Sequence, residues 1–240
     1  MVRAFFENDR VLAFFTDRFG GVSKDKYYSL NVSPFVGDDI KNVVQNRQII
    51  ANKESFYLEN MVYMRQIHSN HVEIIDNSFI NEIKDCDGVV TNRRKIALMV
   101  MAADCAPVLM FDEKNSVISA IHSGRVGTYK NIVKKCIEKM EDSFNSNPKD
   151  IVVEVGPSIG VCCYEIGGDL ACKYNKEYIR VKKDKYFLDL KLMIKDELLE
   201  CGIREEKLKI SSICTCCDES YFSYRRDGKT GRFCGVIMLR

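Results

Sequence analysis

Residues 96–124 read IALMVMAADCAPVLMFDEKNSVISAIHSG, and this stretch decides the fold. It contains three apolar runs, Ile96–Ala102, Val108–Phe111 and Val117–Ile121, which are too short to be helices and are separated by turn residues. The last two runs flank the polar tetrapeptide Glu113-Lys114-Asn115-Ser116. Two apolar runs joined by a short polar loop predict an antiparallel β-hairpin.

The register of this hairpin bears on two residues at its open end. If Asp112 pairs with Val117, Cys105 faces Gly124 and His122 is the diagonal neighbour of Cys105. Diagonal neighbours lie ~7–8 Å apart on one face of a sheet, whereas a slip by one residue would put them on opposite faces. The expected register therefore brings Cys105 and His122 within reach of one metal ion.

Helices and further strands are expected on both sides of the hairpin. Apolar residues recur at helical spacing from Thr128, the expected N-cap, to Phe144. The other expected helices cover about 39–52 and 189–201, and the other expected strands cover 61–67, 151–155 and 208–213. Helices interleaved with buried strands predict an α+β fold, a layered α/β sandwich with mixed sheets, in a single domain over residues 1–240.

The charges of the chain are nearly balanced. The sequence has 36 Lys and Arg against 34 Asp and Glu, for a net charge of +2. A nucleic-acid-binding surface needs clustered basic residues, so we expect no nucleic-acid partner. No segment approaches the ~18 uninterrupted apolar residues of a membrane span, and the charged stretch Met1–Phe15 does not fit an export signal. We therefore expect a cytoplasmic protein without membrane contact.

The cysteines favour a reducing compartment. There are 11, an odd number, in a chain without an export signal, and this favours free thiols over a disulfide framework. The densest group, Cys214-Thr215-Cys216-Cys217, has no second half at zinc-finger spacing. We expect these cysteines to be mostly structural, packed like small hydrophobic residues.

Two of the three histidines lie beside the most unusual local sequences. His68, Cys105 and His122 each stand where an apolar run ends and small or polar residues begin. One Cys and two His form a three-ligand set for a transition metal and leave a fourth position for water or substrate, as catalytic sites do. The third histidine, His71, is expected outside the ligand set. The alternative is a pair of structural histidines and an inert buried thiol.

Six motifs follow one another in fixed order along the chain. They are Arg65-Gln66-Ile67-His68, Asp87-Gly88-Val89-Val90-Thr91, Ala103-Asp104-Cys105-Ala106-Pro107-Val108-Leu109, His122-Ser123-Gly124, residues 156–165 (GPSIGVCCYE) and residues 222–232 (FSYRRDGKTGR). The series resembles the YfiH/YlmD family of purine nucleoside phosphorylases, formerly called multicopper polyphenol oxidases or laccase-domain proteins. The resemblance covers essentially the whole chain and is highly specific.

The resemblance implies a single zinc ion held by one Cys and two His, which map onto His68, Cys105 and His122. Copper is less favoured, because a multicopper cluster needs more than the three histidines present. The implied activity is phosphorolysis of adenosine, inosine, guanosine and methylthioadenosine, with adenosine deamination as a companion activity. Purine nucleosides and phosphate are therefore the expected partners, and these motifs define no oligomeric state.

The sequence departs from the family after the second histidine ligand. Relatives usually continue His-Ala-Gly-Trp-Arg-Gly-Thr, whereas this chain has His122-Ser123-Gly124-Arg125-Val126-Gly127-Thr128 and contains no tryptophan. The histidine is intact, so we expect metal binding to be little affected. The replacement bears instead on substrate contacts from this loop and on the preference among nucleosides.

Further residues are candidates for substrate binding and catalysis. Arg47 stands on the apolar stripe of the helix expected over 39–52 and either extends past its edge to solvent or binds phosphate through its guanidinium. Asp104 is either a solvated turn carboxylate or a proton carrier and acceptor for a ligand or ribose hydroxyl. The resemblance adds Arg65, Asp87 and Glu165. The predicted catalytic residues are thus Asp104 and Cys105, and the predicted substrate-binding residues are Arg47, Arg65, Asp87 and Glu165.

A cationic cluster near the C-terminus is a weaker candidate. Arg225, Arg226, Lys229 and Arg232 are expected in a solvated loop, with phosphate binding as the alternative. The tripeptide Gly228-Lys229-Thr230 lacks the earlier glycine and the following helix of an ATP-binding phosphate loop, so we exclude that site.

Two other functions are compatible with these residues. A metal-free thiol hydrolase would use Cys105 as the nucleophile and His68 or His122 as the base. A non-catalytic binding protein with a vestigial site would fit the altered loop after His122. The metal content of the purified protein distinguishes the thiol enzyme from the zinc phosphorylase.

Overall fold

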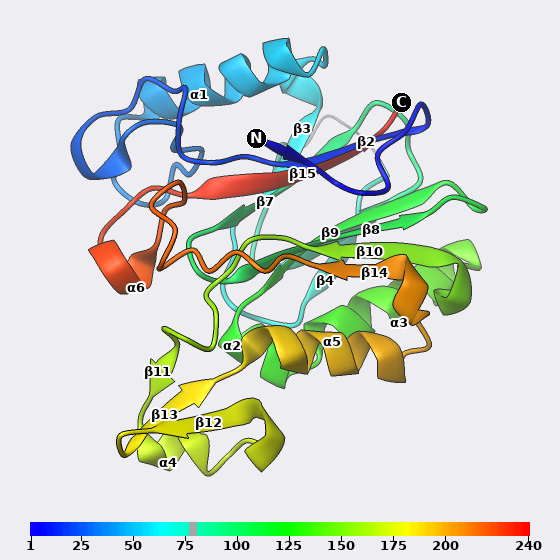
Figure 1. Cartoon of the computed structure of the whole chain (residues 1–240). Coiled ribbons are helices and arrows are strands. Elements are labelled where there is room, and N and C mark those ends of the chain that lie inside the picture. The colour runs from blue at the N-terminus through cyan, green and yellow to red at the C-terminus, as the bar shows by residue number, and fades with distance from the viewer. Residues whose placement is uncertain (77–80) are drawn as a thin grey trace.

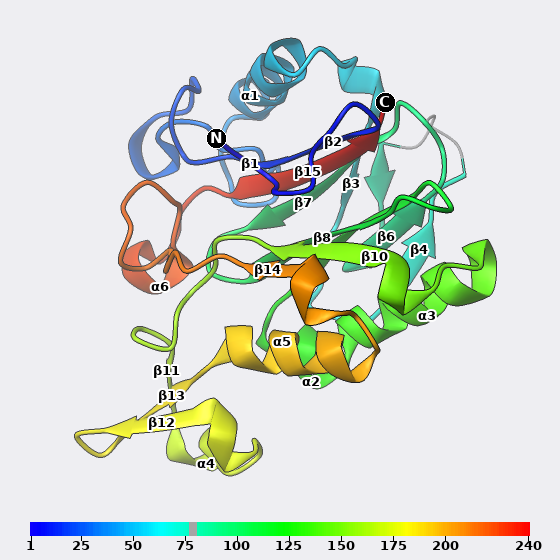
Figure 2. The same ribbon diagram turned by 45° about the vertical axis from the view of Figure 1, so that its right-hand side comes forward.

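The computed structural model describes residues 1–76 and 81–240. Two six-stranded sheets form its centre and lie face to face (Figures 1 and 2). The first sheet has the order β1 (Val2–Arg3), β2 (Val11–Phe15), β15 (Phe233–Leu239), β7 (Ala97–Ala102), β3 (Met61–Met64) and β5 (Glu82–Ile83). The second has the order β14 (Leu208–Ile210), β10 (Ile151–Val155), β8 (Ala106–Asp112), β9 (Val117–Ser123), β6 (Gly88–Thr91) and β4 (Val72–Ile74). Both sheets are mixed, since each contains parallel and antiparallel pairs.

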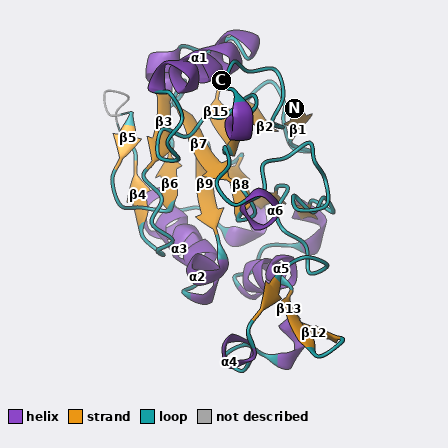
Figure 3. Cartoon of the chain, turned by 90° about the vertical axis from the view of Figure 1, so that its left-hand side faces the viewer, coloured by secondary structure: helices purple, strands orange, loops and turns teal. Residues whose placement is uncertain are grey.

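Helices cover the outer faces of the two sheets. α1 (Ile40–Lys53) lies over the first sheet, and α3 (Ile132–Phe144) and α5 (Leu190–Glu200) lie under the second (Figure 1). The shorter helices are α2 (Arg125–Tyr129), α4 (Gly168–Ala171) and α6 (Tyr224–Asp227), and 3₁₀ turns occur at Asp25–Tyr27, Leu58–Asn60, Pro148–Asp150, Lys176–Tyr178 and Glu205–Lys207. A small third sheet of β11 (Glu165–Ile166), β13 (Lys185–Leu188) and β12 (Ile179–Lys182) protrudes with α4 at one end of the molecule (Figures 1 and 3).

The central strands are buried on both faces, which explains their unbroken apolar sequences. In β7, Leu98 and Val100 belong to the core between the sheets, whereas Met99 and Met101 belong to the layer that includes residues of α1. β8 alternates in the same way between the central core and the layer that includes residues of α3 and α5. Alternate side chains of a strand point to opposite faces, so a strand inside a layered sandwich needs apolar residues at every position.

The structure confirms the fold class, an α+β layered sandwich with mixed sheets, and the register of the hairpin. Asp112 pairs with Val117, and Ala106 pairs with Ser123 at the other end. Cys105, one residue before β8, therefore lies at the same end of the hairpin as the last residues of β9. Within the described residues, no helix is both long and apolar enough to cross a membrane.

The predicted helix over 128–144 is wrong at its start, because two helices cover this region. Asn131 has a left-handed backbone, with φ of 59°, and separates α2 from α3. Asn is among the few residues that adopt this conformation at low cost. Thr128 is not an N-cap: it lies in α2, and its hydroxyl donates to the Gly124 carbonyl at 2.9 Å. Two predicted strands are also shorter than expected, since β3 ends at Met64 and β14 at Ile210.

Candidate metal centre and substrate pocket

The fold brings His68, Cys105 and His122 together from three segments. His68 follows β3, Cys105 lies in the connection between β7 and β8, and His122 is the penultimate residue of β9. One ligand atom from each residue lies within 4.8 Å of the other two. Cys105 Sγ is 3.9 Å from His68 Nε2, and the two imidazole centroids are 4.8 Å apart at 79°. We refer to these three residues as the candidate metal centre.

The spacing of these atoms fits zinc. With Zn–S of ~2.3 Å and Zn–N of ~2.0–2.1 Å, tetrahedral geometry separates a sulfur and a nitrogen ligand by about 3.6 Å. The 3.9 Å between Cys105 Sγ and His68 Nε2 is close to that value. A thiolate with two imidazoles is also a donor set that zinc accepts. The three residues would hold the ion and leave one position open.

Asp87 positions two of the three candidate ligands. Its buried carboxylate accepts the backbone N–H of His68 at 3.0 Å and of Ser69 at 2.6 Å, and it binds His122 Nδ1 at 2.8 Å. Because Nδ1 is held by Asp87, His122 presents Nε2 to the site. Burial alone would raise the pKa of Asp87, but the hydrogen bonds and charge of His122 together with Ser69 lower it. Asp87 is thus an ionised carboxylate that fixes the orientation of the histidine.

Cys105 and His122 shift each other's pKa in opposite directions. Burial alone would raise the pKa of Cys105, but the positive charge of His122 and hydrogen bonds to both imidazoles lower it to about 6. Burial opposes protonation of His122, yet the Cys105 thiolate and the bond to Asp87 raise its pKa to about 9. These shifts favour the thiolate form of Cys105, which is the form that binds metals and acts as a nucleophile.

Gly124 allows the close approach of the ligands. A Cβ atom at this position would lie 2.6 Å from Cys105 Sγ and 3.2 Å from His68 Cδ2. Gly124 is also the residue before α2, where the chain turns away from the end of β9. A side chain at this point would occupy the space that the candidate ligands need.

A cavity of about 440 Å³ opens onto the candidate metal centre, a volume within the range of small-molecule sites. Aromatic rings of Phe35, Tyr164 and Tyr224 form part of its wall, and Arg225 and Arg232 supply positive charge. The remaining lining residues are Ser33, Val36, Gln66, His68, Met101, Ala102, Ala103, Asp104, Cys105, His122, Ile159 and Leu190. Aromatic surfaces, cations and a candidate metal centre thus share one space.

The two arginines of the cavity have no carboxylate partner among residues 1–76 and 81–240. Arg225 Nη1 donates to the backbone carbonyls of Cys163 and Glu165, and Arg232 Nη1 donates to those of Thr230 and Gly231. Burial lowers the pKa of Arg232 below its ordinary value, while the charges of Cys105 and Asp104 oppose that shift. Cations held by carbonyl groups rather than by acids are suited to receive an anionic ligand.

Asp104 lies in the cavity wall with a backbone φ of 92° and 9% exposure. One carboxylate oxygen accepts from Thr215 Oγ1 at 2.7 Å, and the other accepts from the backbone N–H of Arg225 at 2.6 Å. The carboxylate therefore ties the loop of Cys105 to the two C-terminal loops of the site. A carboxylate offers about four lone-pair positions, so these two bonds leave capacity for a substrate hydroxyl.

The four residues predicted to bind substrate lie one contact away from the cavity lining. Arg47 is 7% exposed, donates to the Val32 carbonyl at 2.9 Å, and approaches Met101 Sδ at 4.0 Å. Its guanidinium also stacks on Tyr63 at 3.8 Å. Ile40 and Val44, two further residues of the apolar stripe predicted for this helix, are 56% and 48% exposed, so the stripe is only partly buried. The other three residues contact the lining as follows. The Arg65 guanidinium lies 5.4 Å from the centroid of the Phe35 ring, and the Asp87 carboxylate is hydrogen-bonded to His122 at 2.8 Å. The Glu165 carbonyl accepts a hydrogen bond from Arg225 at 2.9 Å.

The exposed side chains of this group have other partners. Arg65 pairs with Glu82 at 2.8 Å, and the Glu165 carboxylate pairs with Lys185 at 3.0 Å. His71 binds Glu73 on the surface and is not part of the group that could hold a metal.

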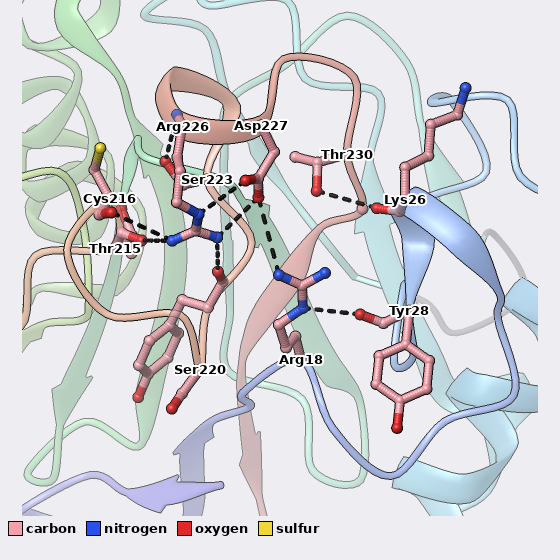
Figure 4. A network of polar contacts seen from close by, with 12 residues as sticks. Arg18, Lys26, Tyr28, Thr215, Cys216, Ser220, Ser223, Arg226, Asp227 and Thr230 are labelled. Atoms are coloured by element: carbon pink, nitrogen blue, oxygen red, sulfur yellow. Dashed lines mark hydrogen bonds and ion pairs between the residues drawn. The ribbon is translucent and has the colours of Figure 1, made fainter.

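The predicted cationic cluster divides into residues with different roles. Figure 4 shows Arg226 donating to backbone carbonyls, including those of Thr215 and Cys216, and pairing with Asp227 at 2.8 Å. Arg226 thus holds the C-terminal loops together, whereas Arg225 and Arg232 line the cavity. The sequence made these two arginines weaker candidates for phosphate binding, because a run of basic residues does not indicate which side chains face a cavity. Phe35 gave no signal, since it lies in a loop far from every motif.

The Cys-His₂ group lines an open cavity, and this arrangement is typical of proteins with a mononuclear metal centre. A family model described as multi-copper polyphenol oxidoreductase laccase matches residues 12–240. A purine nucleoside phosphorylase of Corynebacterium glutamicum is 37% identical over 238 residues, which are 97% of this chain and 96% of the relative. The purine nucleoside phosphorylase YlmD of Bacillus subtilis is 32% identical over 256 residues, covering 97% of this chain and 90% of the relative.

Solved structures agree with this match. YfiH of Bacillus licheniformis superposes with a TM-score of 0.91 at 31% identity, over 96% of this chain and 93% of that one. YlmD of Geobacillus stearothermophilus gives a TM-score of 0.91 at 30% identity, over 97% of this chain and 93% of that one. The chain belongs to this laccase-like family, which confirms the resemblance to YfiH and YlmD proteins.

Proposed function

We propose that this protein is a zinc-dependent purine nucleoside phosphorylase, formed by residues 1–240 and acting in the cytoplasm. The observation that carries the proposal is one cavity in which the three candidate ligands meet two arginines without carboxylate partners among the described residues. The names of the relatives from C. glutamicum and B. subtilis support the same activity. The proposed substrates are adenosine, inosine, guanosine and methylthioadenosine, with deamination of adenosine as a companion activity.

Phosphorolysis needs phosphate and nucleoside held in one geometry. A phosphate oxygen forms the bond to the anomeric carbon of the ribose while the bond from that carbon to the purine nitrogen breaks. The electron pair of the broken bond goes to the purine, which then takes up a proton. Arg225 and Arg232 would hold the phosphate by charge-assisted hydrogen bonds, and its position fixes the line of attack.

The cavity wall offers matching contacts for the nucleoside. Phe35, Tyr164 and Tyr224 provide aromatic surface for a purine ring. Asp104 would accept a ribose hydroxyl on its remaining lone pairs, which is the role we propose for this predicted catalytic residue. Arg47, Arg65, Asp87 and Glu165 would act on substrate through the lining residues that they contact.

Zinc held by His68, Cys105 and His122 would supply Lewis acidity toward a substrate oxygen or a water molecule, moderated by its thiolate ligand. The residues around it have defined tasks. Asp87 keeps His122 in the orientation that directs Nε2 into the site, and Gly124 leaves room for Cys105.

A second candidate function is a thiol hydrolase, and a specific contact favours it. Asp87, His122 and Cys105 lie in the order carboxylate, imidazole, thiolate, which is also the arrangement of a nucleophilic triad. His68 argues for the metal, because a triad has no use for a second imidazole 3.9 Å from the sulfur. The third alternative, a binding protein without catalysis, predicts no product from any nucleoside.

The experiment is to incubate the protein with phosphate and a panel of nucleosides and to separate the products by chromatography. The proposal expects free purine base and ribose 1-phosphate, formed only when phosphate is present. Hydrolysis without phosphate would favour the thiol enzyme, and intact nucleosides throughout would favour the binding protein. Inosine formed from adenosine would identify the companion deamination.

A further inference from the structure

Four cysteines gather outside the candidate metal centre. Cys162 and Cys163 lie in the loop after β10, and Cys214 and Cys217 lie in the loop after β14. Their sulfur atoms all lie within 4.8 Å of one another. Cys217 Sγ is 3.3 Å from Cys163 Sγ and 3.7 Å from Cys162 Sγ. We name this group the four-cysteine cluster.

The distances in the cluster fit a single tetrahedral ion. Four thiolates around zinc at ~2.3 Å lie about 3.8 Å apart. A disulfide requires ~2.05 Å between two sulfurs, well below the 3.3 and 3.7 Å separations here. Cys214 and Cys217 also have the Cys-x₂-Cys spacing of zinc-binding turns. The other two ligands are the adjacent residues Cys162 and Cys163, and Cys163 precedes Cys214 by 51 positions.

The backbone around the cluster is already arranged for thiolates. The Gly160 N–H donates to Cys214 Sγ at 3.2 Å, and the Cys217 N–H donates to the Cys214 carbonyl at 3.1 Å. Ser158 and Cys214 form an isolated parallel bridge that sets the two loops side by side. Hydrogen bonds from backbone N–H groups favour the charged form of a sulfur ligand. Two loops far apart in the sequence are thus held in register at the point where the sulfurs meet.

We propose that Cys162, Cys163, Cys214 and Cys217 bind one structural zinc ion, distinct from the ion of the candidate metal centre. Four thiolates close the coordination shell and leave no position for substrate, as structural zinc sites do. Cys214 and Cys217 are expected from the sequence to be mostly structural thiols, because no second cysteine pair follows at zinc-finger spacing. That expectation missed the partner pair Cys162-Cys163, which lies in a different loop.

The proposed ion would stabilise one wall of the substrate cavity by linking the two loops that form it. Tyr164, next to Cys163, lines the cavity, and the Cys163 carbonyl accepts from Arg225 Nη1 at 3.1 Å. Thr215, next to Cys214, donates to Asp104 at 2.7 Å. A zinc ion joining both loops would therefore hold an aromatic ring, a cation and a carboxylate of the cavity in fixed relation, without touching substrate.

The first test is the metal content of the intact protein and of Cys105→Ser, purified without added metal. We expect about two zinc ions per wild-type chain and about one in Cys105→Ser. X-ray absorption of Cys105→Ser should report a zinc shell of sulfur alone at ~2.3 Å. No variant of the cluster is needed for this result, so misfolding cannot mimic it.

The second test compares Cys214→Ser combined with Cys217→Ser against Cys216→Ser, a cysteine in the same loop outside the cluster. The double variant should lose one zinc equivalent and gain hydrogen exchange over residues 156–165 and 211–228, whereas Cys216→Ser should lose neither. Retention of all zinc in the double variant would overturn the proposal. So would iron in place of zinc, or a disulfide found by mass spectrometry of the unreduced protein.

The proposed phosphorylase and the structural zinc can fail separately. A protein with one sulfur-only zinc that survives Cys105→Ser would reject the catalytic zinc and support the cluster. A protein with one zinc in a mixed sulfur and nitrogen shell, lost in Cys105→Ser, would reject the cluster and support the catalytic zinc.

Discussion

The candidate metal centre and the four-cysteine cluster place similar ligands in different surroundings. The centre stands at the ends of strands, includes two imidazoles, and opens onto the cavity lined by Phe35, Tyr164 and Tyr224. The cluster joins two loops, consists of sulfur alone, and lies outside the lining of that cavity. Three ligands with an open position suit catalysis, and four ligands with a closed shell suit structure.

The residues that support the ligands also differ between the candidate metal centre and the four-cysteine cluster. A buried carboxylate, Asp87, orients the histidine of the centre, whereas backbone N–H groups such as that of Gly160 serve the cluster. A reacting site needs ligands held in one orientation before substrate arrives, while a structural site needs only that its loops meet. Substitutions that act on one group and spare the other can test this division.

The largest expected effect is that of Cys105→Ser on catalysis. A neutral hydroxyl replaces a thiolate, so zinc affinity and phosphorolysis should fall by at least ~100-fold, more than the loss of a supporting residue causes. Excess zinc should restore part of the activity, as measured by initial rates against added zinc. If Cys105 were a nucleophile, activity would vanish and zinc would restore none of it.

Asp87→Asn should weaken the centre without changing its ligands. Loss of the carboxylate that orients His122 is expected to lower zinc affinity by ~10–100-fold, measured by competition with a chromophoric chelator. Asp112→Asn is the matched control, since this buried carboxylate caps the hairpin loop by accepting from the Lys114 and Asn115 N–H groups. The control should lose stability and keep its zinc affinity. Equal zinc affinity in both variants would remove Asp87 from its assigned role.

Arg232→Ala should raise KM for phosphate by roughly 10-fold, the value of one charge-assisted hydrogen bond. Its zinc content should be unchanged. Arg226→Ala, which loses contacts to backbone carbonyls, should lower Tm and leave KM for phosphate unaltered.

Arg47→Ala tests the sequence-based hypothesis that Arg47 supports the use of phosphate or nucleoside. The variant should use phosphate or nucleoside less well and keep its zinc content. A variant that loses stability with normal kinetics per folded molecule would make Arg47 a packing residue.

Two glycines allow the same substitution in both groups of ligands. An added Cβ would lie 2.6 Å from Cys105 Sγ in Gly124→Ala and 3.1 Å from Cys162 Sγ in Gly160→Ala. Gly124→Ala should lower kcat several-fold, whereas Gly160→Ala should lower Tm with a smaller change in kcat. Gly167→Ala is the control, because no atom lies within 4 Å of its added Cβ. Identical kinetic profiles for the first two variants would contradict the proposed division of roles.

Thiol reactivity of the metal-free protein distinguishes a sulfur of the candidate metal centre from a sulfur of the four-cysteine cluster. Burial would raise the Cys105 pKa, but the charge of His122 lowers it from 9.0 to about 6, so the thiolate persists above pH 6 and is lost as pH falls through that value. Burial and neighbouring thiols raise the pKa of Cys162 to about 11. Alkylation at pH 7 should favour Cys105 over Cys162 by roughly 30- to 90-fold, because the larger thiolate fraction of Cys105 outweighs the lower nucleophilicity that accompanies its lower pKa. Preferential labelling of Cys162 in peptide mapping would contradict this order.

Much of the fold could be predicted from the sequence because its strands carry a local pattern. The hairpin register followed from the loop between Asp112 and Val117, and it set Cys105 and His122 at one end. The break between α2 and α3 could not be predicted, because the apolar periodicity continues through it while Asn131 adopts a left-handed backbone.

The site was predictable to the extent that each part lies in a motif. The three candidate ligands stand in the motifs themselves, whereas the cavity wall combines residues such as Phe35 and Arg232 from segments without a shared local pattern. The four-cysteine cluster escaped detection for the same reason, since its two pairs meet only in three dimensions. Long-range packing, rather than spacing along the chain, determines which of these side chains lie together.

The most direct test of the central claim is phosphorolysis by wild-type protein before and after removal of its metal. The protein should cleave a purine nucleoside in phosphate buffer, lose that activity when a chelator has removed zinc from His68, Cys105 and His122, and regain it when zinc is added back. Full phosphorolysis by protein shown to be metal-free would contradict the claim and assign the chemistry to the Cys105 thiolate.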